Sequence, residues 1–405
     1  MLKRWSWFTV ALLLVTSAFS VGARAEEEGG GEAGLDLSLR TTAAAMPLTT
    51  ADGSTLESPA SHVELLDYTT GTVLASRAAD AKMYPSSMTK MMTLYIIFDK
   101  LKQGTLSLDS QFTVSEKAWR MQGSKMFVPL GSQIPLSDLI RGIAIASGND
   151  ACIVVAEGIA GSEEAFAGQM NETGKKLGMT ATNFTDASGW PNAAHTTTPH
   201  DLAVLAAAII RDFPDDYHYL SEREFTFHNI RQFNRNLLLG NAALHVDGLK
   251  TGHTEAAGYG ITLSAVDPAT NRRLILVLNG LDSAELRASE GERILQWGLR
   301  NFDNLVLFKP GKEVTKAAVW MGTTLDTPLT VANDVVMSIP KLGRDKIKIT
   351  ASHKGPLIAP VAAGTQVGSL TITLANGSTK EVPLVTAQAV EKLGFFARFT
   401  RRLGL

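Results

Sequence analysis

Residues 85–93 read Pro-Ser-Ser-Met-Thr-Lys-Met-Met-Thr, and apolar residues continue at helical spacing to Leu101. Because proline favours the first turn of a helix, this pattern predicts a helix that begins near Ser87 and ends by Gly104. Residues three apart share one helix face, so the Lys90 amine is expected to reach the Ser87 hydroxyl. Serine is a weak nucleophile until a base takes its proton, and lysine is such a base only when neutral, a state favoured by burial and a nearby cation.

Two further short motifs supply the groups that such a serine and lysine need. Residues 147–149 read Ser-Gly-Asn in a turn expected between two helices, and they offer a hydroxyl for proton transfer and an amide for a peptide carbonyl. Residues 250–252 read Lys-Thr-Gly at an expected strand start and offer a second cation, a hydroxyl donor for a carboxylate, and a glycine that permits close backbone approach. The three motifs together are typical of serine β-lactamases and penicillin-binding proteins. These residue types predict an acyl-enzyme mechanism.

The sequence around these motifs predicts an α/β domain in which strands precede and follow a block of helices. Strands are expected at residues 62–67, 72–76, 258–266 and 273–278. Helices are expected at residues 137–146, 151–159, 163–177, 201–211 and 283–300. This first domain is assigned to residues 59–303.

From about residue 305 the helical pattern gives way to short strand-like runs separated by proline and glycine. The strongest runs are residues 305–308, 335–339, 347–350 and 370–374. We therefore predict a small all-β domain over residues 304–386. A short basic amphipathic helix is predicted over residues 387–405, suited to an anionic membrane surface. A helix docked on the β-domain is the alternative for that segment.

Length and composition agree with two soluble domains. The chain has 405 residues, of which 45% are hydrophobic and 19% are charged, with a net charge of −2 that gives no reason to expect nucleic acid as a partner. Cys152 is the only cysteine, so no intramolecular disulfide can form. We expect Cys152 to be a small buried apolar residue and not a reactive thiol.

The N-terminus has the features of an export signal. Lys3 and Arg4 lead an apolar stretch that closes with Ala23-Arg-Ala25, which predicts a cleaved signal peptide over residues 1–25. An uncleaved membrane anchor is the alternative. Residues 26–58 form an acidic, glycine-rich leader, for which only a solvated spacer role is expected.

The motifs with their neighbours resemble those of the low-molecular-weight penicillin-binding proteins, the serine D-alanyl-D-alanine carboxypeptidases of peptidase family S11. The resemblance covers residues 60–400 and is carried by residues 85–93, by Ser147-Gly-Asn-Asp-Ala-Cys152 and by Asp247-Gly-Leu-Lys-Thr-Gly-His-Thr254. It implies a transpeptidase-like α/β fold, with an antiparallel sheet and a helical block, followed by the all-β domain and the terminal helix.

The resemblance also implies a role for each site residue. Ser87 would be the acylated nucleophile, Lys90 its general base and Ser147 the hydroxyl that relays a proton to the leaving D-alanine. Asn149 would hold the substrate backbone, and Lys250 and Thr251 would contact the terminal carboxylate, where Gly252 lets the backbone approach the substrate closely. The backbone N–H groups of Ser87 and His253 would form the oxyanion hole, and Arg287 would lie near the carboxylate pocket.

The implied substrates are peptidoglycan stem peptides, with β-lactam antibiotics as inhibitors and no metal or organic cofactor. The implied location is the periplasm, attached to the outer face of the inner membrane. Trp190 and Pro191 lie in a loop that varies within the family, so substrate preference stays open.

Three other functions compete with the carboxypeptidase. A class A β-lactamase needs a glutamate in a loop that corresponds to residues 180–200, and this segment contains none. A D,D-endopeptidase is separated from this chain mainly by the β-domain and the terminal helix that are predicted here after residue 303. A penicillin-binding scaffold with little turnover would not need an intact Ser87, Lys90 and Lys250.

Overall fold

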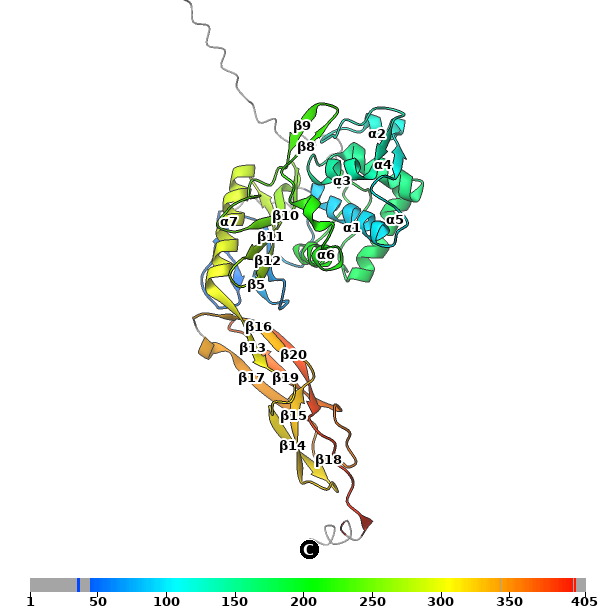
Figure 1. The fold of residues 1–405 in the computed structure, drawn as a ribbon. Coiled ribbons are helices and arrows are strands. Elements are labelled where there is room, and N and C mark those ends of the chain that lie inside the picture. Colours follow the sequence, from blue (N-terminus) through cyan, green and yellow to red (C-terminus); the bar gives the residue numbers. More distant parts are fainter. Residues whose placement is uncertain (1–34, 37–43, 343, 396, 398–405) are drawn as a thin grey trace, which may run out of the picture.

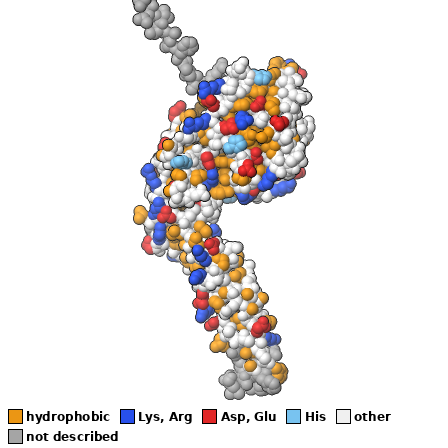
Figure 2. Space-filling model, in the orientation of Figure 1, with side chains coloured by type: hydrophobic (Ala, Val, Ile, Leu, Met, Phe, Trp, Pro, Cys, Tyr) orange, Lys and Arg blue, Asp and Glu red, His pale blue; other side chains and the backbone are white. Residues whose placement is uncertain are grey.

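The computed structural model describes residues 35–36, 44–342, 344–395 and 397. They form two domains that follow one another along the chain, an N-terminal domain ending with helix α7 (Ala284–Asn301) and a C-terminal domain beginning with strand β13 (Phe302–Phe308) (Figure 1). Basic and acidic side chains are interspersed over both domains on the face that Figure 2 shows.

An antiparallel six-stranded sheet forms the centre of the N-terminal domain, with the strand order β10-β11-β12-β4-β5-β2. The strands span β10 Val246–Thr254, β11 Gly258–Asp267, β12 Arg272–Leu281, β4 His62–Asp67, β5 Val73–Arg77 and β2 Thr49–Thr50. Strand β10 lies at one edge, so only one of its sides is paired within this sheet.

Strand β12 explains how the sheet is held between two layers of helices. Ile275 and Val277 pack into the core that the helical block shares, whereas Leu274, Leu276 and Leu278 pack into a second core on the side of α7. Because side chains alternate along a strand, a strand covered on both faces reads as a continuous apolar run. Figure 1 shows α7 on one side of the sheet and the block of helices on the other.

The helical block contains the helices predicted from periodicity and one short helix that was not predicted. They are α1 Lys90–Lys102, α2 Glu116–Arg120, α3 Leu136–Ala144, α4 Asn149–Ala160, α5 Glu163–Leu177 and α6 Pro199–Asp212. The expected helix start at Ser87 is different in the structure. Residues Ser86–Thr89 form a 3-10 turn, η2, and the α-helix begins at Lys90.

Short two-stranded pairs complete the N-terminal domain. They are β1 Met46–Pro47 with β3 Glu57–Ser58, β6 Gln111–Thr113 with β7 Gln133–Pro135, and β8 Glu224–Phe227 with β9 Ile230–Phe233. The β8–β9 hairpin turns through His228 and Asn229, both with positive φ (46° and 62°), as a two-residue hairpin turn requires.

The C-terminal domain is all β. Its main sheet has the order β17-β19-β20-β15-β14-β18, and β13 pairs separately with β16. The further strands span β14 Thr315–Trp320, β15 Asp326–Val331, β16 Val335–Pro340, β17 Lys348–His353, β18 Leu357–Ile358, β19 Gln366–Thr373 and β20 Thr379–Thr386. The predicted fold class, an α/β domain followed by an all-β domain, is confirmed.

The end of the chain differs from the predicted helix over residues 387–405. Residues 387–394 are not helical. Val390 forms an isolated β-bridge with Val361, and Lys392 forms one with Gly322, so the backbone of this segment pairs in extended form with the C-terminal domain. The rest of the predicted helix lies mostly outside the described residues, as does the predicted signal peptide.

A buried polar network joins the two domains. Arg272 Nε pairs with Asp67 Oδ2 at 2.6 Å, and both side chains are almost completely buried. Asp67 Oδ1 also accepts a hydrogen bond from Asn304 Nδ2 of β13 at 3.1 Å. On the neighbouring loop, the Thr70 and Ser338 hydroxyls lie 2.8 Å apart.

Candidate active site

Lys90 lies in a fully buried position with three polar partners. Its Nζ is 2.7 Å from Ser87 Oγ, 2.7 Å from Asn149 Oδ1 and 2.8 Å from the carbonyl oxygen of Ser188. In the 3-10 turn, residues three apart are stacked, which brings Ser87 and Lys90 together. Ser87 itself is 2% exposed.

The types of these partners decide how a neutral Lys90 amine is oriented. Such an amine has two N–H donors and one lone pair. Asn149 Nδ2 donates to the carbonyl oxygen of Gln122 at 3.0 Å, which turns Oδ1 toward Lys90. Asn149 Oδ1 and Ser188 O can only accept, so they take both N–H groups and the lone pair faces Ser87 Oγ. The arrangement is suited to removal of the serine proton.

A second lysine and serine pair lies in the same site. Lys250 Nζ donates to Ser147 Oγ at 3.0 Å and to Thr251 O at 3.1 Å. Ser147 is completely buried and has a φ of +57°, a left-handed conformation that non-glycine residues seldom adopt and that occurs often at functional sites. The turn between α3 and α4 thus brings its hydroxyl to β10.

Gly252 lets β10 lie directly against the turn that carries Ser87. A Cβ atom added at Gly252 would be 2.9 Å from the carbonyl oxygen of Pro85 and 3.2 Å from the backbone nitrogen of Ser87. A side chain at this position would therefore force the strand away from the turn. This close approach brings the Gly252 backbone beside the backbone of Ser87.

Side chains alternate between the two faces of β10, so Thr251 and His253 lie on a different face from Lys250. Thr251 and His253 point to the opposite face of the sheet, where the His253 ring stacks on Tyr259 with centroids 3.9 Å apart. Arg287 of α7 also lies against Tyr259, with its Cζ 5.6 Å from the centroid of that ring.

Arg287 is 2% exposed, and its guanidinium donates to the carbonyl oxygens of Gly252, Gly260 and Arg235. These contacts support the backbone of β10 from the face of α7. The structure therefore joins Ser87 and Asn149 to Lys90 by hydrogen bonds, and Ser147 to Lys250 by another. Thr251, His253 and Arg287 lie on the other side of the strand.

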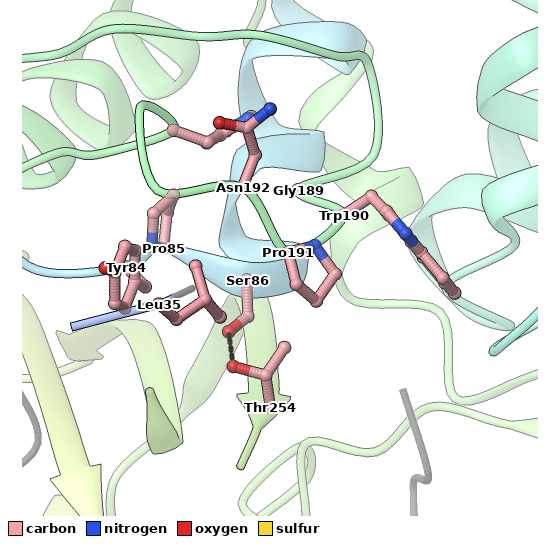
Figure 3. A pocket seen from close by; sticks show the side chains of 10 residues that line it. Leu35, Tyr84, Pro85, Ser86, Gly189, Trp190, Pro191, Asn192 and Thr254 are labelled. Carbon is pink, nitrogen blue, oxygen red and sulfur yellow. Dashed lines mark hydrogen bonds between the residues drawn. The ribbon is translucent and has the colours of Figure 1, made fainter. Parts of the chain in front are cut away.

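A narrow pocket adjoins the turn of residues 86–89 that carries Ser87 (Figure 3). It is lined by residues 84–86, by the loop residues 189–192, and by Leu35, His195 and Thr254. Ser86 Oγ donates to Thr254 Oγ1 at 3.4 Å across it, and the Trp190 side chain extends away from Ser86. Leader residues also reach this region, since Asp36 N donates to the Tyr84 hydroxyl at 3.0 Å.

Several supporting residues were not predicted from the sequence. The buried Asp150 carboxylate accepts hydrogen bonds from the backbone N–H groups of Met126, Phe127 and Val128, and it thereby holds the loop next to Asn149. Asp186 and His195 organise the loop that presents the Ser188 carbonyl. Turn-forming Asp-Ala-Ser-Gly was the only sequence signal for this loop.

Cys152, on α4, is completely buried. Burial raises the pKa of its thiol to about 12. The thiol is therefore protonated at neutral pH, as expected of a packed apolar residue.

Comparison with known proteins gives two adjacent family matches. Residues 49–283 match the model of the D-alanyl-D-alanine carboxypeptidase family, and residues 302–392 match that of the penicillin-binding protein 5 C-terminal domain. D-alanyl-D-alanine carboxypeptidase DacC of Escherichia coli is 39% identical over 341 residues, covering 82% of this chain and 85% of the relative. DacF of Bacillus subtilis is 31% identical over 359 residues, covering 87% and 91%.

Solved structures share the fold over most of the chain or over part of it. Penicillin-binding protein 5 from Haemophilus influenzae is 36% identical, with a TM-score of 0.72, and the match covers 82% of this chain and 98% of that chain. Penicillin-binding protein D2 from Listeria monocytogenes, solved in an ampicillin-bound form, is 26% identical with a TM-score of 0.54 and covers 60% of this chain and 98% of its own.

Proposed function

The chain belongs to the D-alanyl-D-alanine carboxypeptidase family and has D,D-carboxypeptidase function, and from this premise we propose that Ser87 is its acylated nucleophile and Lys90 its general base. The observation that carries this assignment is the Lys90 amine, 2.7 Å from Ser87 Oγ, with its other two partners restricted to accepting. The substrate proposed is a peptidoglycan stem peptide that ends in D-alanyl-D-alanine.

Acylation follows from the positions of the two serine and lysine pairs. Ser87 Oγ attacks the carbonyl carbon of the penultimate D-alanine while its proton passes to Lys90 Nζ. The peptide C–N bond then breaks, and the leaving amine takes up the proton that Lys90 received, which leaves Lys90 neutral for the next step. Ser147 supplies the route for that proton because its hydroxyl is held by Lys250 at 3.0 Å. The products of this step are free D-alanine and an ester on Ser87.

Deacylation uses the same base for water. Lys90 takes a proton from a water molecule, the water oxygen attacks the ester carbonyl, and the bond to Ser87 Oγ breaks with return of the proton to the serine. The backbone N–H groups of Ser87 and His253 are proposed to stabilise the oxyanion in both steps. Close contact of Gly252 with the Ser87 turn supports this pairing of donors.

Terminal carboxylate recognition is assigned to the β10 side of the site. Lys250 is the cation of this pocket, with its Nζ 3.0 Å from Ser147 Oγ. Asn149 has a second N–H besides the one that it gives to Gln122 O, and we assign this donor to a carbonyl of the substrate backbone. Arg287 would act on the pocket through the β10 backbone that it contacts.

β-Lactams are proposed to acylate Ser87 in place of the stem peptide. The ampicillin-bound form of the Listeria relative supports this for the family. In a β-lactam the leaving nitrogen stays tethered to the acyl group, so the ester on Ser87 is expected to persist longer than the one formed from a peptide.

The proposed location is the periplasm, at the outer face of the inner membrane. The sequence features behind it are the predicted signal peptide of residues 1–25 and the cations of residues 398–402. Both segments lie outside the described residues. Within the described ranges, no helix is long and apolar enough to cross a membrane.

One experiment tests the assignment of the two catalytic groups. D-alanine release from a pentapeptide ending in D-Ala-D-Ala is measured beside labelling by a fluorescent penicillin, for the wild type, Ser87→Ala and Lys90→Met. Methionine fills the buried space of the lysine stem without an amine, so a folded Lys90→Met protein is expected to lose both signals. Undiminished labelling of Lys90→Met would remove Lys90 from its role, and labelling of Ser87→Ala would remove Ser87.

A further inference from the structure

Loop residues 186–190 are folded around a single carboxylate oxygen. Asp186 Oδ1 accepts hydrogen bonds from the backbone N–H groups of Ser188 at 2.8 Å, Gly189 at 2.7 Å and Trp190 at 3.0 Å, and from the Ser188 hydroxyl at 2.9 Å. The same loop directs the Ser188 carbonyl oxygen to Lys90 Nζ. The carboxylate therefore fixes one of the two acceptors that orient the Lys90 amine.

Asp186's other oxygen connects this loop to the turn of the nucleophile. Oδ2 lies 2.9 Å from His195 Nδ1, and His195 Nε2 lies 2.9 Å from Thr89 Oγ1, one residue before Lys90. Thr185 N also approaches Nδ1 at 3.2 Å. The shorter, charge-assisted contact places the Nδ1 proton toward Asp186, and Nε2 on the other side of the ring faces the Thr89 hydroxyl.

Both members of the pair are held away from water. His195 is 1% exposed and the Asp186 side chain 15%. Burial alone would raise the pKa of Asp186, but the hydrogen bond and charge of His195 and the loop N–H groups outweigh it and hold the pKa well below its usual range. Gly189 packs the loop against the turn, since an added Cβ would lie 1.9 Å from Ser86 O.

We propose that Asp186 and His195 are positioning residues that hold the Lys90 amine in the orientation in which its lone pair faces Ser87. Asp186 does so through the Ser188 carbonyl, and His195 does so through Thr89. The inference rests on the roles proposed for Ser87 and Lys90. Loss of the pair leaves the substrate-binding residues in place but lets the amine turn away, so it lowers kcat more than it raises KM.

Charge gives the pair a pH signature that a purely structural role lacks. Without His195, the Asp186 carboxylate loses the hydrogen bond and the charge that stabilise it. Its negative charge then favours a protonated amine at Lys90, so the acid limb of the kcat/KM profile moves to higher pH. In Asp186→Asn the negative charge is absent, and the limb moves to lower pH. The other titratable groups around the pair and Lys90 are Asp150 and Cys152 of α4, Glu163 of α5 with its partner Lys117, and Lys250 of β10.

The test measures kcat, KM and the pH profile for D-alanine release by the full chain, in His195→Ala, Asp186→Asn and the control His200→Ala. His200 is half-exposed and pairs with Glu64 instead. We expect kcat to fall on the order of 100-fold in the first two variants, with acid limbs displaced in opposite directions. The control is expected to match the wild type. Wild-type kcat in both variants, or limbs displaced in the same direction, would overturn the proposal.

Thr89 variants keep the proposal testable if His195→Ala does not fold. Thr89→Val removes the hydroxyl that bonds to His195 with little change of shape, whereas Thr89→Ser keeps it. A fall in kcat in the valine variant that serine restores supports the proposal, and equal kcat in both contradicts it. Ser87→Ala, run in parallel, separates the two levels: if it still releases D-alanine, the proposed function itself fails, whatever the Thr89 variants do.

Discussion

Lys250 Nζ and Ser147 Oγ lie 3.0 Å apart and form a second buried lysine–serine pair in addition to Lys90 and Ser87, which lie 2.7 Å apart. The two pairs differ in their surroundings. Lys90 has two further acceptors that use its N–H groups, whereas Ser147 is held in a left-handed conformation at the start of α4. This difference suits Lys90 for removal of a proton and Ser147 for its delivery to the leaving group.

Ser147→Ala is therefore expected to slow acylation more than it weakens binding. A general acid contributes about 10²–10⁴-fold to a rate, and the alanine variant loses that part for a peptide substrate whose amine must be protonated. Single-turnover acylation and D-alanine release measure the effect. A variant with wild-type rates on both would show that the proton takes another route.

Gly252→Ala tests the contact between β10 and the nucleophile turn. The added Cβ would be 2.9 Å from Pro85 O and 3.2 Å from Ser87 N, so the strand must move away from Ser87. We expect slower labelling by fluorescent penicillin and slower D-alanine release, because the oxyanion donors are displaced. Gly168→Ala is the matched control, since nothing lies within 4 Å of its added Cβ. Equal loss of activity in both variants would contradict the steric argument.

The Asp67–Arg272 ion pair is expected to dominate stability at the domain junction. Asp67→Ala leaves the buried Arg272 guanidinium without its carboxylate and also removes the acceptor of Asn304. The expected loss in free energy of unfolding is about 3–5 kcal/mol, from denaturant titration. The exposed pair of Glu116 and Arg120 serves as comparison, and Glu116→Ala is expected to cost about 0–1 kcal/mol. Similar losses in both would mean that burial of the pair contributes little.

The sequence was most informative where chemistry and local periodicity coincide. Ser87 and Lys90 could be paired because three residues of helical chain bring them together, even though the first turn is 3-10 and not α. Lys250 and Ser147 could be grouped only through the family resemblance, since 103 residues separate them and the contact depends on how β10 packs on the turn.

The features that could not be predicted depend on contacts between residues that are far apart in the sequence. Asp186 and His195 were missed because a turn-forming aspartate and a single histidine have no pattern until the loop folds back on Thr89. Arg287 was expected at the carboxylate pocket, but sequence alone could not place its guanidinium behind the carbonyls of β10. The predicted helix from residue 387 was wrong over residues 387–394, because apolar spacing cannot distinguish a helix face from an extended segment that forms isolated β-bridges.

Two truncations test the membrane proposal for the end of the chain, and the structure fixes where each should stop. Val390 is 2% exposed and packs with Val319, Ala359 and Val361, so a chain ending before it loses part of the C-terminal core. A chain ending at Gly394 keeps that core and the backbone bond from Leu393 N to Met321 O at 2.9 Å. The protein that ends before Val390 is thus expected to be less stable than the protein that ends at Gly394.

A protein ending at Gly394 is expected to keep its D-alanine release from a soluble pentapeptide, because the cluster around Ser87 is untouched. Without the cations of residues 398–402 it loses attraction to anionic lipid, worth about 1 kcal/mol for each basic residue near the surface. We therefore expect it to move from the membrane pellet to the soluble periplasmic fraction. If it stays in the pellet with an unchanged melting temperature, residues 395–405 are not the attachment, and the leader or a partner protein must supply it.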